Sequence, residues 1–187
     1  MSDPIVGEIR AFAFGGDKTT GQHAAIRAAG WLECAGQDVA FNKLPRLYHA
    51  ITNTWGSKSP GTTFSVPDLR GMFLRGWNHG QQTASKADPD AATRVGSGPA
   101  ASGAAGDAVG SFEGFALQQH QHGIGPFTYQ PWGHEGNFGV LADRNGAQGS
   151  TTGVAAGSAA AAETRPSNVY VMYAIYTGTV PVPADVL

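Results

Sequence analysis

The stretch from Phe64 to Trp77 reads FSVPDLRGMFLRGW and defines the local structure around it. Pro67 lacks an amide donor and biases the residue before it toward an extended conformation. Asp68 can accept hydrogen bonds from the amides that follow, as in an Asx turn. The guanidinium of Arg70 or Arg75 can brace loop carbonyls or pair with a carboxylate. A loop held by its own polar groups is therefore predicted here, with a carboxylate–guanidinium active site as the alternative.

Upstream of this stretch, the apolar pattern predicts one strand and two helices. A strand is expected within Ile5–Phe14, because β-branched and aromatic residues are frequent there. A short helix is expected over Gln22–Ala29, ended by Gly30. A second helix is expected over Lys43–Trp55, where apolar residues follow the spacing of one buried face. Asn42 is the expected N-cap of that helix.

Downstream, the clearest pattern is a strand over Asn168–Thr177. Alternate residues on both of its faces are mainly apolar, so we expect it to be covered on both sides. The chain also has 27 glycines and 11 prolines among 187 residues, which is typical of a turn-rich protein. The predicted fold class is mainly β with irregular Gly-rich loops and one or two short helices (α+β).

Composition divides the chain into four parts. The segment 81–110 is built from small and polar residues, so an extended or mobile loop is expected there. The C-terminal tail, residues 180–187, contains two prolines and is expected to be an edge strand or an arm. The predicted organisation is an N-terminal domain at 4–80, an Ala/Gly-rich loop at 81–110, a C-terminal region with a His-x-His pair at 111–177 and a C-terminal arm at 178–187.

Charge and cysteine content exclude several classes of protein. The formal net charge is -2, which argues against a nucleic-acid-binding surface. No apolar run reaches the roughly 18 residues of a membrane span, so none is expected. The N-terminus lacks the cationic and apolar regions of a signal peptide, so we expect none. Cys34 is the single cysteine and is predicted to be a structural thiol.

Four distinct motifs follow one another along the chain. They are GWLECAGQ at 30–37, the stretch already quoted at 64–77, GDAVGSF at 106–112 followed by His120-Gln121-His122, and ETRPSNVYVMY at 163–173. This arrangement resembles the phage tail-collar family, which includes the collar or head regions of short tail fibres and the small microcystin-dependent-protein relatives. The resemblance covers residues 4 to 177. A structural role is predicted for residues of the second and fourth motifs, namely Asp68, Arg70, Arg75, Arg165 and Asn168.

The resemblance implies a part of a phage tail or of a phage-derived injection particle. Members of the family are commonly trimeric and touch a cell surface, so a collar-type domain intertwined in a homotrimer is expected. The implied partners are other copies of the chain, other tail or baseplate proteins, and a bacterial surface glycan or protein. The implied location is the virion tail or a phage-like particle assembled in the bacterial cytoplasm.

The sharpest chemical signal is the pair His120 and His122. On a strand, residues i and i+2 point to the same side, so the two imidazoles would face one direction. Three copies around a three-fold axis would bring six nitrogens together, an octahedral site compatible by ligand type with Fe, Zn or Ni. The resemblance supports a divalent metal shared across a trimer, because trimeric tail-fibre proteins use such pairs in this way. The alternative is two surface histidines.

Aromatic side chains in Gly- and Pro-rich loops suggest a receptor surface between residues 129 and 145. Flat rings on loops can stack on sugar faces, and loops on a rigid scaffold commonly carry binding. The candidate receptor-binding residues are Tyr129, Trp132, His134 and Asn137. A buried satellite cluster is the alternative. For Trp31, Trp55 and Trp77, core packing is predicted instead.

No enzyme template is found in the sequence. The nucleophile elbow, the P-loop and the zincin motif are all missing. Asp88 and Asp90 are paired acids, but they stand in an Ala-rich loop that offers little desolvation to shift a pKa. The chain is therefore predicted not to be an enzyme. The leading hypothesis is multivalent receptor binding, and the alternatives are a structural or assembly protein of the tail and a surface-acting hydrolase.

Overall fold

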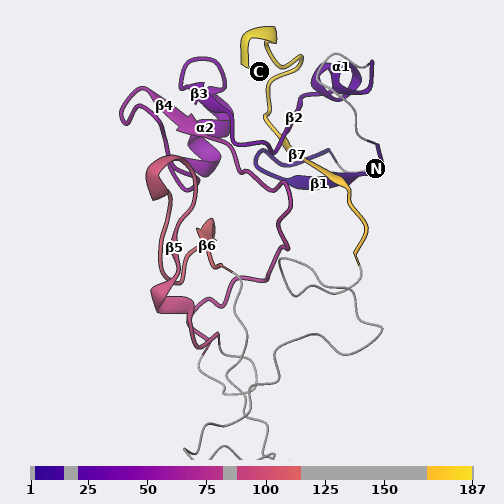
Figure 1. Cartoon of the computed structure of the whole chain (residues 1–187). Coiled ribbons are helices and arrows are strands. Elements are labelled where there is room, and N and C mark those ends of the chain that lie inside the picture. Colours follow the sequence, from indigo (N-terminus) through magenta and orange to yellow (C-terminus); the bar gives the residue numbers. More distant parts are fainter. Residues whose placement is uncertain (1–2, 15–20, 82–87, 115–167, 187) are drawn as a thin grey trace, which may run out of the picture. The chain divides into compact units, whose positions relative to one another are not determined.

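The structure is a computed structural model that describes residues 3–14, 21–81, 88–114 and 168–186 (Figure 1). They belong to one compact unit, which Met1–Gly114 and Ser167–Leu187 build together. The two ends of the chain therefore contribute to the same unit.

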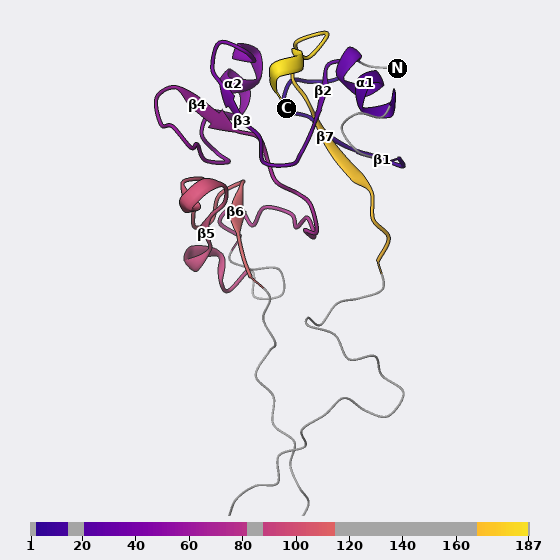
Figure 2. The ribbon, with the colours of Figure 1, turned by 45° about the horizontal axis from the view of Figure 1, so that its top comes forward.

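The main sheet has three antiparallel strands in the order β1-β7-β2. They are β1 (Ile9–Phe12), β2 (Trp31–Glu33) and β7 (Met172–Tyr176). Ile175 in β7 lies opposite Ile9 on one side and Leu32 on the other. Figures 1 and 2 show the yellow β7 between the two indigo-to-purple strands. The last strand of the chain is thus the central strand of the sheet.

The predicted coverage of β7 on both faces is confirmed. Ile175 packs in a large apolar cluster with residues such as Leu32 and Leu47, whereas Ala174 packs in a second cluster with Ile26 and Trp31. The alternation of a strand explains this division, because neighbouring side chains point to opposite faces. The strand is shorter than expected, since Asn168–Val171 precedes it without strand pairing.

The first helix, α1 (Gly21–Ala28), confirms the prediction within one residue at each end. It buries His23 and Ile26, three positions apart on one face. Gly30 follows with a φ of +86°, a conformation that favours glycine, and its amide donates to the Arg27 carbonyl. A Cβ at this position would also meet Tyr176 at 2.9 Å, so the helix end is fitted closely to β7.

The second helix, α2 (Pro45–Ile51), is shorter than the predicted Lys43–Trp55. The predicted N-cap is wrong: Leu44 occupies that position, because the Lys43 amide first closes a turn on the Ala40 carbonyl. The buried face is as predicted, with Leu44 and Leu47 fully buried. Among the helices of the described residues, none is long and apolar enough to cross a membrane.

A two-stranded sheet pairs β3 (Asp38–Ala40) with β4 (Thr63–Ser65). The Asp38 carboxylate accepts the Ser65 hydroxyl at 3.0 Å and the Lys58 amide at 2.9 Å. These bonds tie the end of this strand pair to the loop that precedes β4. Phe64 in β4 is fully buried against the main core, and β4 leads directly into the quoted PDLRG segment.

The chain between 88 and 114 differs from the extended loop expected for 81–110. It contains the 3₁₀ turns η1 (Ala91–Thr93) and η2 (Pro99–Ala101) and the short antiparallel strands β5 (Val95–Gly96) and β6 (Ser111–Phe112). Its backbone bonds to the segment after α2: the Ala104 amide donates to the Thr54 carbonyl at 2.8 Å. Backbone and glycine contacts thus order a segment that has few large apolar side chains.

The tail beyond Gly178 is packed and is not a free arm. Val182 and Val186 are buried in the main cluster, and η3 (Ala184–Val186) carries the second of them. The Val182 amide donates to the Arg27 carbonyl at 3.0 Å, and the Arg27 guanidinium donates to the Pro183 carbonyl at 2.6 Å. The tail forms no strand, as its prolines indicate, but Val182 and Val186 pack in the core where an edge or an arm was expected.

Candidate functional site

The PDLRG segment forms the self-braced loop that its residues suggest. The Arg70 amide donates to Asp68 Oδ1 at 3.3 Å, which closes the Asx turn. The Arg70 guanidinium also donates to both carboxylate oxygens of Asp68, at 2.8 and 2.6 Å. These side-chain hydrogen bonds from Arg70 hold the pKa of Asp68 below its usual value. Pro67 and Leu69 are buried, whereas Asp68 and Arg70 are exposed. Alternate residues therefore attach the loop to the core and leave the ion pair at the surface.

Three of the four sequence motifs meet at this loop. The Gly36 amide donates to the Pro67 carbonyl at 3.1 Å, and the Leu69 amide donates to the Cys34 carbonyl at 3.0 Å. The Cys34 amide in turn donates to the Tyr173 carbonyl at 2.8 Å. Backbone hydrogen bonds therefore connect the first, second and fourth motifs, which are far apart in the sequence.

The third motif is joined to the second through Asp107. Its carboxylate accepts the Gly80 amide at 2.7 Å, the Asn78 side chain at 3.3 Å and the Arg94 guanidinium at 3.0 Å. Its carbonyl accepts the Trp77 indole N–H at 3.1 Å. The hydrogen bond from the Gly80 amide is the main cause that lowers the pKa of Asp107. Asp107 thus organises the chain beyond the PDLRG loop.

The core prediction is confirmed for Trp31 and wrong for Trp77. Trp31 is 6% exposed, and Trp55 is partly buried against the main cluster. Trp77 is 47% exposed and stacks on His79, with ring centroids 4.0 Å apart. The ring is held by its indole N–H and by this stack, so position in a motif did not decide its burial.

The acidic residue Asp88 also differs from its prediction. Its side chain is 5% exposed and lies near Arg75 Nη1 at 3.5 Å and Arg94 Nε at 3.9 Å. Arg75 Nη1 also lies 3.4 Å from the Glu113 carboxylate. Because charged groups are rarely buried without a partner, this network explains how Asp88 can be buried. It fixes the start of the 88–114 segment to the end of the PDLRG stretch.

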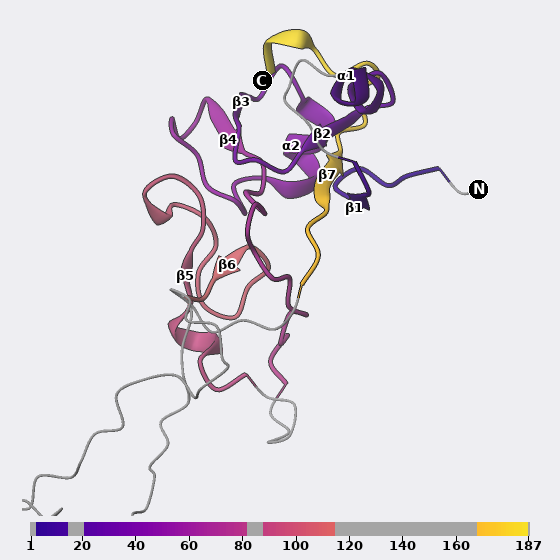
Figure 3. The ribbon, with the colours of Figure 1, turned by 45° about the vertical axis from the view of Figure 1, so that its right-hand side comes forward.

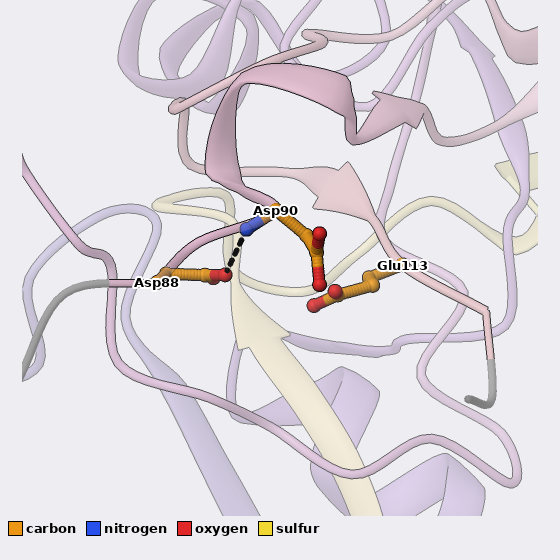
Figure 4. A group of neighbouring side chains, drawn as sticks. All are labelled: Asp88, Asp90 and Glu113. Carbon is orange, nitrogen blue, oxygen red and sulfur yellow. Dashed lines mark hydrogen bonds between the residues drawn. The ribbon is translucent and has the colours of Figure 1, made fainter. Parts of the chain in front are cut away.

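Asp88, Asp90 and Glu113 form the one carboxylate group in the described residues whose oxygens could share an ion (Figure 4). These oxygens lie within 4.8 Å of one another, and Asp88 accepts the Asp90 amide at 3.1 Å. Carboxylate oxygens suit hard cations such as Ca²⁺. The guanidinium groups of Arg75 and Arg94 already lie beside the Asp88 carboxylate and balance its charge. We therefore assign no metal to this group.

Most of the sequence-predicted site residues lie outside the described residues. These are His120, His122, Tyr129, Trp132, His134, Asn137 and Arg165. Asn168 is exposed at the start of the last described segment. The metal pair and the receptor residues therefore stay predictions. Asp107 and Arg94 were missed as organising residues; the third motif contains Asp107, but nothing in the sequence points to Arg94.

Two apolar segments face solvent in the described unit. Met72, Phe73 and Leu74 are 44%, 65% and 53% exposed, although they directly follow the PDLRG loop. Val169 and Tyr170, before β7, are 89% and 78% exposed. Large apolar side chains exposed in consecutive positions commonly mark an interaction surface.

Comparison with known families accounts for this arrangement. Residues 7–74 match the family model described as the Phage Tail Collar Domain. The chain contains a phage tail collar domain. The resemblance inferred from the sequence motifs is therefore confirmed over residues 7–74. The matched residues of the collar domain run from just before β1 to the exposed Leu74, and β7 completes their sheet from outside the match.

Two curated relatives are similar to this chain. Protein RhiB of Rhizobium leguminosarum bv. viciae is 33% identical over 152 residues, which is 80% of this chain and 65% of RhiB. Protein StfE of Escherichia coli (strain K12) is 27% identical over 101 residues, which is 54% of this chain and 40% of StfE. The chain thus spans less than two thirds of the length of either relative.

Proposed function

We propose that this chain is a tail-fibre or tail-tip component of a phage or phage-derived particle that binds a bacterial surface receptor. The match of residues 7–74 to the phage tail collar domain carries the proposal. A glycan is the proposed receptor class, and Tyr129, Trp132, His134 and Asn137 are the proposed receptor-binding residues. The proposed location is the tail of the particle, and no catalytic step is needed for this role.

The proposed assembly is a homotrimer. It is supported by the exposed apolar side chains around Phe73 and at Val169, because burying such side chains against other chains is favourable. Three copies would make binding multivalent, so weak individual sites gain from a high effective concentration. A divalent metal (Fe, Zn or Ni) held by His120 and His122 of three copies belongs to the same proposal.

An assembly role without receptor binding is the second candidate. The same exposed segments could contact other tail or baseplate proteins, since an apolar surface does not specify its partner. The two roles differ in whether the folded protein alone recognises an envelope component.

The test combines oligomeric mass, metal content and receptor binding on one preparation. We expect light scattering to give the mass of three chains, with about one metal per trimer that is lost in a His120→Ala/His122→Ala variant. Selective signals on a glycan array, lost in Trp132→Ala and kept in Trp77→Ala, would support receptor binding. A trimer without such signals would favour the assembly role, and a metal-free monomer would contradict the three-fold proposal.

A further inference from the structure

A pocket of about 370 Å³ lies at the end of the main sheet where β1 and β2 finish. Its walls come from four separated segments: the end of β1 with Phe14, Glu33 and Cys34, the loop at 69–71, and the chain at 170–173. Figure 3 shows these ends of β1, β2 and β7 close together in a view turned from that of Figure 1. The volume lies in the range of about 300–1,000 Å³ that is usual for small-molecule sites.

Aromatic rings supply much of the pocket wall. Phe12 and Phe14 line it with ring centroids 5.5 Å apart and planes inclined by 56°. Tyr170 and Tyr173 line it from the other end of the chain, and Tyr170 is 78% exposed. Aromatic rings carry a negative face that attracts a cation through the ring quadrupole.

The charged groups at the pocket favour the same kind of ligand. Glu33 lines the pocket, and in the described part of the chain its carboxylate accepts no hydrogen bond; its one ion-pair contact is His23 Nδ1 at 3.9 Å. Arg70 also lines the pocket, but both carboxylate oxygens of Asp68 accept its guanidinium. The three groups together carry one net negative charge.

Two carboxylates also act on the buried thiol of Cys34, which lines the pocket. Burial, followed by the charges of Glu33 and Asp68, raises the pKa of Cys34 to about 12. The part of this shift that comes from the two carboxylates has the sign that would also oppose an anionic ligand.

We propose that this pocket binds a small organic ammonium cation of the choline type, with its methyl groups against the aromatic rings and its charge near Glu33. Quaternary ammonium groups are recognised by aromatic walls with a nearby negative charge. They lose less hydration than a primary ammonium when they enter such a site, because they donate no hydrogen bonds. This site lies in the described unit and is independent of the receptor residues between 129 and 145.

The test compares choline with 3,3-dimethylbutan-1-ol, which has the same shape and no charge. Both would be titrated into the isotopically labelled full chain, and amide and side-chain NMR shifts would be followed. We expect choline to bind at least about tenfold more tightly than the neutral alcohol. The shifts should concentrate at Phe12, Phe14, Tyr170 and Tyr173.

Two variants test separately how the carboxylate and the aromatic rings contribute to choline binding. Glu33→Gln keeps the shape of the side chain and should weaken choline binding about tenfold while leaving the alcohol unchanged. Tyr170→Leu changes an exposed side chain, so the variant should fold normally, and its affinity for choline should also be lower. Glu113→Gln removes a carboxylate that does not line the pocket, and choline should bind to it as to the unmodified chain.

Several results would overturn the proposal. Equal binding of choline and the alcohol would show an apolar pocket without a preference for charge. Shifts confined to residues outside the pocket would exclude the site, and so would the lack of choline binding at concentrations up to tens of millimolar. If Glu33→Gln does not fold, unchanged choline binding in Tyr170→Leu would suffice to reject the proposal.

Discussion

Gly98 lies so close to Trp55 that a Cβ atom on Gly98 would overlap the Trp55 carbonyl oxygen. Gly98 also has a φ of +76°, in the left-handed region that disfavours other residues. The residue thus joins the 88–114 segment to the end of α2 by direct backbone approach. Only a residue without a side chain fits there.

We therefore expect Gly98→Ala to destabilise the described unit. The strained φ and the steric overlap should together cost about 2–4 kcal/mol of unfolding free energy, measured by chemical denaturation. Gly76→Ala is the matched control, because a Cβ there meets no atom within 4 Å and the φ is not positive. Equal stabilities of the two variants would contradict the close packing at Gly98.

Leu47 in α2 is the test of the main core. Its side chain is completely buried, with 0% relative accessibility, and packs in the large apolar cluster. Leu47→Ala should lower the unfolding free energy by about 2–5 kcal/mol, through lost transfer energy and the cavity left behind. Ile5→Ala, at a side chain 77% exposed, should change it by less than about 0.5 kcal/mol. A small effect of Leu47→Ala would argue against the position of α2.

Cys34 should be chemically inert in the folded protein. Its thiol is 2% exposed, and its pKa is raised to about 12, so little thiolate exists at pH 8. We expect no reaction with a thiol reagent such as dithionitrobenzoate under native conditions and one thiol per chain in guanidinium chloride. Rapid labelling of the native protein would contradict the burial of Cys34.

The pair of Asp68 and Arg70 makes a pH-dependent contribution to the loop. Hydrogen bonds from Arg70 lower the pKa of Asp68, so the folded state favours the carboxylate. The stabilisation is complete above the ordinary carboxyl pKa and is lost as the pH falls through the lowered one, below about pH 4. In Arg70→Gln, the Asp68 pKa measured by NMR should rise toward its ordinary value.

Lys43→Gln is the control for that titration, because Lys43 pairs with Asp185 and not with Asp68. It should leave the Asp68 pKa unchanged. Both partners of the Asp68–Arg70 pair are largely exposed, so the effect on stability at neutral pH should be below about 1 kcal/mol. An unchanged Asp68 pKa in Arg70→Gln would mean that other groups lower it.

The part of the site that could be predicted from the sequence is the part made by near neighbours. Asp68 reaches the amide and guanidinium two residues ahead, so its turn follows from local chemistry. The ion-pair network at Asp88 is different, because Arg75, Arg94 and Glu113 come from separate places in the chain. Nothing in the residues next to Asp88 indicates these partners.

The sequence by itself determined the two short helices, the two-sided burial of β7 and the membership of residues 7–74 in the collar domain. These depend on spacing, turn residues and motifs that can be read along the chain. Tertiary structure alone decided that Trp77 is exposed, that Val182 is buried, and that the segment 88–114 is ordered. The physical reason is that burial depends on which distant backbone comes close, and small residues allow that approach without leaving an apolar pattern.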